Sequence, residues 1–491
     1  MERKQHKRPT TIMQEHPEFT RTSAVYVSTH QEEMKGLLDS LSTQEVRESC
    51  RNKASLRDTM CMQSRTGVIY ASARAKEFGW TGPDDPLWGN LGQGAPETQP
   101  LPNQPERNLH VDLTDETNEY SSVNGRSDLR EAVANYYNKF FRSGKESQYS
   151  PENVAIVAGG RAGLSRLMCT LHNCNVGYSL PDYTAYSQLL GEFNGISPIV
   201  VEQDEENCTA TSAESLRRQV RLHGLGGFLF SNPGNPTGTI VRGQKLSEYC
   251  AIARDENCLM LMDEFYSHYC YDEDSDEGRA SVEARGFNAF SSAEFVDDVD
   301  EDPVVIINGL TKNWRLPGWR VCWVVGPRHA IDVLASVGSF MDGGANQPLQ
   351  AAAPSLLNID FVRDDAIALQ AHFRAKRDYL VDNLRRLGIV VESPDATFYL
   401  WANVGSLPPP LNNGVIFFEH CIRHKVICCP GIFFDVNPYH RRKYTRSPFV
   451  NFVRLSFGPK WQNLHLAMAA IERMVNSARK GKIGPLTEPA A

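Results

Sequence analysis

The sequence predicts an α/β protein whose main sheet is largely parallel. Short apolar runs recur between residues 154 and 325, and stretches with helical periodicity separate them. Their apolarity is continuous rather than alternating, as in strands that are buried on both faces. Glycine-rich or charged residues follow several runs, where open α/β sheets place their ligands. The runs are 154–158, 176–180, 227–230, 258–262, 304–307 and 321–325.

The pattern changes on both sides of this region. Residues 1–65 are polar and only faintly periodic, with one possible helix at 44–53. The predicted segments are an N-terminal extension (1–65), an N-terminal arm together with part of the small domain (66–105), a large domain with the sheet (106–350), a small C-terminal domain (351–480) and a tail (481–491).

Helical and strand patterns mix in the C-terminal part. Leucines and phenylalanines at helical spacing predict a long helix over 369–387 and a last helix over 464–475. Short strands are expected at 398–401 and 426–428, so this part is predicted to be α+β. Within the large domain, the acidic stretch 272–302 is expected to be a surface insertion.

Composition disfavours several classes of protein. Of the 491 residues, 41% are hydrophobic and 22% charged, which is ordinary for a globular enzyme. A net charge of −8 without a long basic run disfavours nucleic-acid binding. No apolar run approaches the roughly 20 residues that a membrane helix needs. The twelve cysteines are dispersed and lack zinc spacing, which is typical of reduced thiols in a cytoplasmic protein. Small molecules, and no metal, are the expected partners.

Two cations follow the run at 304–307. A lysine held where an apolar strand ends can lose its proton and attack a carbonyl, and Lys312 has this position. Arg320, beside a Pro-Gly turn, could hold an anion in its planar fork. Taken alone, this segment favours the interpretation that both are solvated loop cations.

Three other motifs also follow apolar runs. Gly159-Gly160-Arg161 leads from a strand into a helix, whose unpaired amides suit an anion, although such turns also occur without a ligand. The other two motifs are Asn232-Pro233-Gly234-Asn235-Pro236-Thr237-Gly238 and Asp263-Glu264-Phe265-Tyr266.

These motifs and their order resemble the class I/II aminotransferases, which are pyridoxal 5′-phosphate (PLP) enzymes of fold type I. The resemblance covers roughly residues 66–478. It implies that the large domain binds PLP and that the chain transfers the α-amino group of an amino acid to a 2-oxo acid through a Lys312 Schiff base.

The resemblance also implies roles for residues around the pyridine ring. Lys312 matches the lysine that binds the aldehyde and shuttles the α-proton, and Asp263 matches the carboxylate that faces the ring nitrogen. Asn235 and Tyr266 match the groups that hydrogen-bond the phenolic oxygen. Tyr183 lies where the family stacks an aromatic ring on the cofactor.

The phosphate and the substrate have counterparts of their own. Gly159, Gly160, Arg161 and Thr311 resemble the phosphate cradle, and Arg320 matches the arginine that binds the phosphate. Three further matches are Tyr120, which resembles the tyrosine that reaches the phosphate of the partner subunit and so implies a homodimer; Arg454, which matches the arginine for the substrate α-carboxylate; and Gly94, which with Asn235 belongs to the substrate-binding set.

Two residues depart from the family pattern. Gly309 stands where many relatives carry a serine that binds the phosphate, and Thr311 could supply a hydroxyl instead. Arg315 replaces a small residue. It could add a cation near phosphate or substrate, or form a structural ion pair with the acidic 272–302 stretch, and the structural role is slightly favoured.

The motifs define the cofactor better than the reaction. Transamination is the leading hypothesis. The alternatives are a PLP-dependent lyase, cyclase or synthase that works by β- or γ-elimination, an oxidase, and, more remotely, a catalytically silent binding protein. Retention of Lys312, Asp263 and Arg454 disfavours the last of these.

Overall fold

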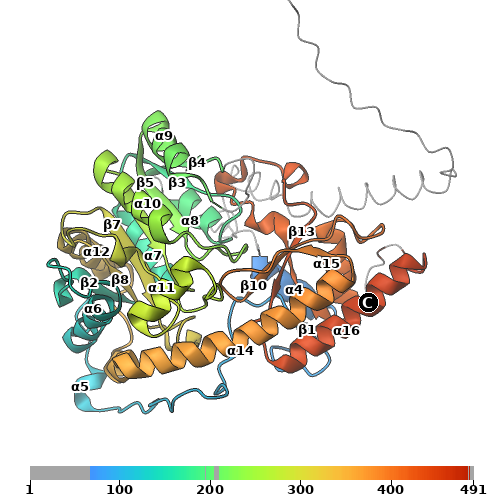
Figure 1. Ribbon diagram of the computed structural model, residues 1–491, viewed down its shortest axis with the longest axis horizontal. Coiled ribbons are helices and arrows are strands. Elements are labelled where there is room, and N and C mark those ends of the chain that lie inside the picture. The colour runs from blue at the N-terminus through green and yellow to red at the C-terminus, as the bar shows by residue number, and fades with distance from the viewer. Residues whose placement is uncertain (1–66, 194, 204–209, 485, 487–491) are drawn as a thin grey trace, which may run out of the picture. The chain divides into compact units, whose positions relative to one another are not determined.

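The computed structural model describes residues 67–193, 195–203, 210–484 and 486 (Figure 1). The N-terminal extension with its expected helix at 44–53, and most of the 481–491 tail, lie outside the described residues. Two further gaps, at 194 and 204–209, flank strand β4.

The large domain is built on a seven-stranded sheet with the order β2-β8-β7-β6-β5-β3-β4. Only β8 runs antiparallel to its neighbours, so the prediction of a largely parallel sheet is confirmed. The strands are β2 (Val154–Val157), β3 (Cys174–Tyr178), β4 (Ile196–Val200), β5 (Leu225–Ser231), β6 (Leu259–Asp263), β7 (Val304–Gly309) and β8 (Cys322–Val325).

Both faces of this sheet are covered. Alternate residues of β2, β6 and β7 enter two separate buried clusters, as expected for strands between two layers of helices (Figure 1). Strand β4 was not predicted. It is a half-exposed edge strand that contains Pro198. Polar residues and the proline interrupt its apolar run, so the sequence does not resemble that of a buried strand. The helices of this domain are α5 (Asp115–Asn118), α6 (Ser127–Phe141), α7 (Gly160–Thr170), α8 (Tyr186–Glu192), α9 (Ala213–His223), α10 (Gly243–Glu256), α11 (Asp276–Arg285), α12 (Arg328–Met341) and α13 (Gln347–Ala352).

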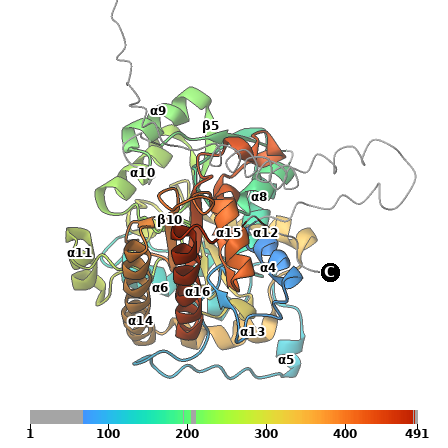
Figure 2. The ribbon, with the colours of Figure 1, turned by 90° about the vertical axis from the view of Figure 1, so that its right-hand side faces the viewer.

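A second sheet organises the C-terminal part. Four strands take the order β12-β13-β10-β9, and a parallel pair joins β1 to β11. Helices α14 and α16 contact each other and lie side by side (Figure 2). The elements are α4 (Gly67–Glu77), β1 (Gly89–Asn90), α14 (Ile359–Arg386), β9 (Val390–Val391), β10 (Tyr399–Asn403), α15 (Gly414–Arg423), β11 (Val426–Ile427), β12 (Cys429–Pro430), β13 (Phe452–Ser456) and α16 (Trp461–Arg479).

The acidic stretch is not wholly a surface insertion, and that expectation was partly wrong. Its helix α11 is largely exposed, but residues 287–293 are buried. They enclose the carboxylate of Glu264, which accepts hydrogen bonds from Ser291 Oγ at 2.6 Å and from Ser292 N at 2.7 Å. The apolar and hydroxyl residues at 287–293 therefore belong to the buried core around Glu264, although the charged residues of the stretch are on the surface.

In the described part of the chain, no helix has the length and apolarity that crossing a bilayer requires. The same residues contain no group of three or more histidine, cysteine or carboxylate side chains arranged to hold a metal ion.

Candidate active site

A pocket of about 970 Å³ lies where several parallel strands of the large sheet end. The register of the sheet pairs Ser231 with Asp263 and Asp263 with Ile307, so the residues that follow β5, β6 and β7 share one edge. The structure brings most of the predicted site residues to this pocket. Those lining it are Gly94, Gly160, Arg161, Tyr183, Asn235, Asp263, Tyr266, Thr311, Lys312, Arg320 and Arg454.

Lys312 follows the end of β7 in a tight turn. The turn is closed by a hydrogen bond from the Arg315 amide to the Lys312 carbonyl, at 2.9 Å. The side-chain amine of Lys312 donates a hydrogen bond to the carbonyl of Gly94. Burial, aided by the charge of Arg454, lowers the pKa of Lys312 to about 8. The amine therefore has a neutral, nucleophilic form at a much lower pH than an exposed lysine has.

Asp263 is the last residue of β6 and is buried. The Tyr186 hydroxyl donates to its Oδ2 at 2.8 Å, and the Phe265 backbone N–H also bonds it. Burial raises its pKa to about 6, so near pH 7 the carboxylate is mostly ionised. No arginine or lysine of the described residues forms an ion pair with it. A buried carboxylate in this condition favours a cationic ligand atom beside it.

Arg454, in the middle of β13, is only 2% exposed. Its Nη1 donates to Asn235 Oδ1 and its Nη2 to the Gly92 carbonyl, both at 3.0 Å. Its Nε has no partner, and within the described chain no carboxylate pairs with it. A buried guanidinium in this condition suits an anionic ligand group.

Tyr399 is a pocket residue that the sequence reasoning missed. Its hydroxyl lies 3.0 Å from that of Tyr266, and the guanidinium of Arg454 lies 4.1 Å from its ring centroid. The antiparallel register pairs Trp401 with Arg454, which places Tyr399 on the same face two residues away. The predicted strand at 398–401 carried the signal, but its pairing with β13 could not be derived.

A glycine turn and an arginine form a cradle of N–H donors at the start of α7. Gly159, the N-cap, has φ of +102°, and a Cβ there would lie 1.8 Å from Arg320 Nη2. A Cβ on Gly160 would lie 2.5 Å from the Phe265 ring. The two glycines thus let the guanidinium and the first amides of the helix approach the same point.

Over residues 88–471 the sequence matches the family described as aminotransferase class I and II. The chain belongs to this family. Glutamate-pyruvate aminotransferase AlaC of Escherichia coli (strain K12) is 27% identical over 363 residues, covering 72% of this chain and 81% of its own length. LL-diaminopimelate aminotransferase of Halothermothrix orenii is 28% identical over 355 residues, covering 70% and 81%.

Solved structures agree on the fold. Aspartate aminotransferase from Thermus thermophilus with maleate has a TM-score of 0.68 and 21% identity, covering 86% of this chain and all of the other. The protein is therefore a PLP-dependent aminotransferase of fold type I, which acts on amino acids and 2-oxo acids.

The pocket of this aminotransferase fits PLP. The buried carboxylate of Asp263 suits a protonated pyridine nitrogen, and Lys312 provides an amine for the aldehyde. The cradle of Gly159, Gly160 and Arg320 suits a phosphate. Among the described residues, neither Asp263 nor Arg320 forms an ion pair, and one PLP molecule carries a ring nitrogen, an aldehyde and a phosphate for the three groups.

The cradle gives a testable prediction. Gly159→Ala should weaken PLP binding, because the new methyl group displaces Arg320 and the positive φ adds strain of roughly 1–3 kcal/mol. Gly144→Ala is the matched control, since Gly144 has φ of +80° and nothing within 4 Å of the new methyl. Spectroscopic titration of both variants with PLP checks this. Equal Kd values in the two variants would contradict the assignment.

Packing limits position 309 to glycine. A Cβ on Gly309 would lie 2.5 Å from Cα and 2.6 Å from Sγ of Cys322, on the adjacent strand β8. No side chain fits at 309 without a shift of that strand. Thr311 is present at the pocket, with its Oγ1 3.1 Å from Cys322 Sγ.

The two tyrosines predicted to contact the cofactor, Tyr183 and Tyr120, lie in different places. Tyr183 is half-buried at the pocket and accepts a hydrogen bond from Arg161 Nε at 3.0 Å. Tyr120 is 95% exposed and does not line the pocket of its own chain.

The proposed ion pair of Arg315 with the 272–302 stretch is wrong. Arg315 is fully buried, and its guanidinium donates to the carbonyls of Glu97 and Gln99 and to Gln104 Oε1. Its hydrogen bonds are structural, as the favoured alternative expected, but the partners lie at residues 97–104 rather than in the acidic stretch. Arg315 also does not line the pocket, so it is not an additional cation for the phosphate.

Proposed function

We propose that this enzyme transaminates an amino acid and a 2-oxo acid at Lys312, with the residue roles that the pocket supports. PLP, when bound, supplies an electron sink for the substrate α-carbon. The single observation that carries the proposal is the arrangement of Lys312 and Asp263. One is a buried amine with a pKa of about 8, the other a buried carboxylate, and they follow neighbouring strands at the same edge of the sheet.

The residues around the ring would control protons. Lys312 would hold PLP by its aldehyde and, after release, carry the α-proton between substrate and cofactor carbons. Asp263 would keep the pyridine nitrogen protonated, with Tyr186 orienting the carboxylate. Tyr266 and Asn235 would hydrogen-bond the phenolic oxygen. Burial holds the pKa of Tyr266 well above its usual range, so its hydroxyl remains a donor.

The residues at the ends would position the two anions. Arg454 would bind the α-carboxylate through its guanidinium, with Asn235 and Gly92 fixing its orientation. Gly159, Gly160, Arg161, Thr311 and Arg320 would hold the phosphate. Tyr183 would cover the ring, and Gly94, which lines the pocket beside Lys312, would contact the substrate.

Single turnover distinguishes transamination from the alternatives. The PLP enzyme is mixed with each amino acid of a panel, and its absorption spectrum and products are recorded. Transamination leaves the amine form of the cofactor and a 2-oxo acid, and added 2-oxo acid regenerates the starting spectrum. Release of ammonia, a cyclised product or consumption of dioxygen without the amine form would instead identify a lyase, a cyclase or an oxidase.

We also propose a homodimer that shares its active sites. An exposed apolar group supports it, because large apolar side chains of segment 109–120 and of the end of α12 face solvent in the single chain. They are Leu109, Leu113, Tyr120, Phe340 and Met341. Light scattering of the purified chain tests this, and a monomer at micromolar concentration would contradict it.

We propose a cytoplasmic location. The nine cysteines of the described residues are all free, and most are buried. This suits a reducing compartment. We further propose that the domain boundaries follow the two sheets, with the large domain at 106–350, the small domain at 351–480 and the arm at 66–105 beside the small domain.

A further inference from the structure

Residues 91–107, here called the strap, contain no helix or strand and reach the active site at their N-terminal end. The carbonyl of Gly92 accepts from Arg454 Nη2 at 3.0 Å, and the carbonyl of Gly94 accepts from the amine of Lys312. The same short segment therefore touches both the proposed carboxylate-binding residue and the proposed catalytic lysine.

Arg315 ties this strap to the turn that carries Lys312. Its Nη1 donates to the Glu97 carbonyl at 2.8 Å and to the Gln99 carbonyl at 2.7 Å, and its Nη2 donates to Gln104 Oε1 at 2.7 Å. All three acceptors belong to the strap. Since the Arg315 amide closes the Lys312 turn, one tight turn carries the lysine and the anchor together.

The other anchors of the strap are also polar. The Glu97 carboxylate accepts from Lys376 and lies 2.7 Å from His372 Nε2, both on α14. Its amide donates to the Gly458 carbonyl at 2.8 Å. Farther along, Arg107 pairs with Asp365 of α14 at 3.2 Å. The strap is thus connected both to the small domain and to the catalytic turn.

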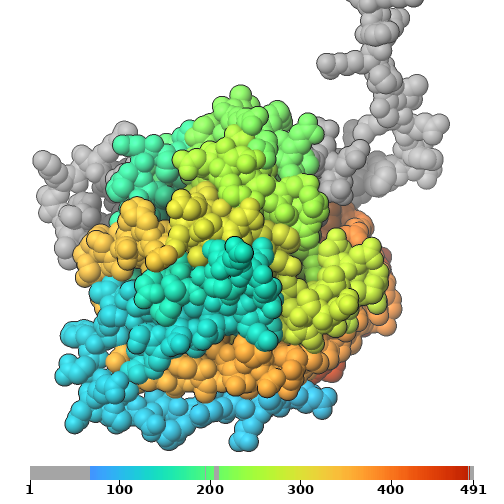
Figure 3. Space-filling view, turned by 60° about the vertical axis from the view of Figure 1, so that its left-hand side comes forward, coloured from blue at the N-terminus to red at the C-terminus, as the bar shows by residue number. Residues whose placement is uncertain are grey.

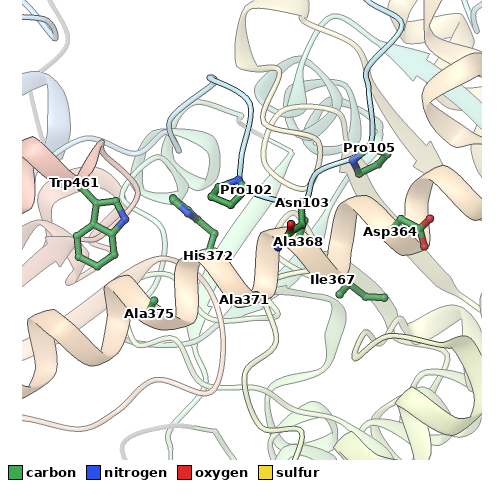
Figure 4. A pocket seen from close by; sticks show the side chains of 10 residues that line it. All are labelled: Pro102, Asn103, Pro105, Asp364, Ile367, Ala368, Ala371, His372, Ala375 and Trp461. Atoms are coloured by element: carbon green, nitrogen blue, oxygen red, sulfur yellow. The ribbon is translucent and has the colours of Figure 1, made fainter.

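Leu91 anchors the start of the strap in the hydrophobic core, but apolar packing holds the later part only weakly. Beyond Glu97 its one buried apolar side chain is Leu101. Pro102 and Pro105 border a pocket of about 620 Å³ between the strap and α14 (Figure 4). In the space-filling view the blue segment before α5 lies along the orange α14 (Figure 3). The cavity lies beneath the part of the strap beyond Glu97, so polar anchors determine the path of that part. At the other end, backbone hydrogen bonds to Ile427 and from Ser456 hold Leu91.

We propose that Arg315 is a positioning residue for amino-acid binding: it fixes the strap so that Gly92 and Gly94 hold Arg454 and Lys312 in register. The inference rests on the proposed function of those two residues. The buried guanidinium has no carboxylate partner in the described chain, and burial lowers its pKa to about 10. Burying an unpaired charge destabilises the folded state. The three strap acceptors account for an arginine at this position, because only a planar guanidinium can donate to all three at once.

The test compares Arg315→Gln with Arg142→Gln. Arg142 is also fully buried and also donates to backbone carbonyls, those of Ala293 and Val296, but it does not touch the strap. The side chain of Arg142 donates five hydrogen bonds and that of Arg315 three, so the control variant loses at least as many. Only the Arg315 variant loses the link between the strap and the Lys312 turn.

Two measurements separate positioning from general stability. Hydrogen exchange of the amides at 91–99 should accelerate in Arg315→Gln and stay unchanged in Arg142→Gln. The second is the Kd of 2-methylalanine, an amino acid without an α-proton, read from the visible absorption of the PLP enzyme. It should rise by about 10- to 10²-fold in Arg315→Gln, because displacement of the strap misplaces Arg454, and remain at the wild-type value in Arg142→Gln.

The proposal would be overturned by an unchanged Kd in Arg315→Gln, or by equal increases in both variants. If Arg315→Gln does not fold, Gln104→Ala removes one acceptor and keeps the arginine. It should raise the Kd in the same direction, and no rise would also overturn the proposal. The probe cannot be transaminated, so its Kd does not depend on the reaction. An enzyme that binds the probe but converts no amino acid of the single-turnover panel to a 2-oxo acid would contradict the proposed reaction and leave the role of Arg315 intact.

Discussion

Lys312→Ala should abolish the visible absorption of the PLP enzyme and lower kcat/KM by on the order of 10⁴-fold or more. Lys312 is the pocket lysine at the end of β7, and burial lowers its pKa to about 8. Its loss removes both the covalent attachment of the aldehyde and the group that moves the α-proton. PLP should still bind through its phosphate, so dialysis and absorption at the wavelength of free PLP measure the remaining affinity.

A second buried lysine provides the control. Burial also lowers the pKa of Lys376 to about 8, but that amine contacts Glu97 and the Pro459 carbonyl, away from the pocket. Lys376→Ala should keep the visible absorption. Loss of the band in Lys376→Ala, or its persistence in Lys312→Ala, would refute the assignment of Lys312.

The second large effect is expected at Asp263. Asp263→Asn keeps the shape of the side chain but removes the charge that stabilises a protonated pyridine nitrogen. The exchange of the substrate α-proton should slow by about 10²- to 10³-fold, as for the loss of other preorganised electrostatic groups. Proton NMR of an amino acid in D₂O with the variant enzyme measures this rate, while the visible absorption shows that PLP is retained.

Glu264 is the matched control for Asp263. It is the next residue, it is buried, and burial raises its pKa to about 7. However, its oxygens face Ser291 and Ser292 rather than the pocket. Glu264→Gln should lower the melting temperature and leave α-proton exchange within a few-fold of wild type. Near-normal exchange in Asp263→Asn would refute its role as the partner of the ring nitrogen.

The sequence predicted those parts of the fold and site that depend on local patterns. Asp263 ends strand β6, and Tyr266 and Lys312 each lie three residues beyond a strand end, so the strand runs alone placed them at one sheet edge. Helix α14 was predicted to start at 369 but begins at Ile359. Its first turns carry Asp360, Arg363 and Asp364, which hide the apolar period.

The features that could not be predicted depend on contacts between distant segments. Arg315 and Glu97 are 218 residues apart, and nothing local to either residue indicates that pairing. Tyr399 joins the site through the register of β10 with β13. Alternative strand registers change which side chains share a face, so pairing must be known before such a residue can be assigned.

The uncompensated charges of the pocket link cofactor supply to the lifetime of the protein. Asp263 and Arg454 are buried ions without an oppositely charged partner among the described residues, and such groups lower the free energy of unfolding. Ligands that supply the missing charges bind only the native state. At 100 times Kd, such a ligand adds about 2.7 kcal/mol of stability. Chains made when PLP is scarce would therefore unfold and be degraded more readily. The cellular amount of the enzyme would then depend on the supply of PLP as well as on the rate of synthesis.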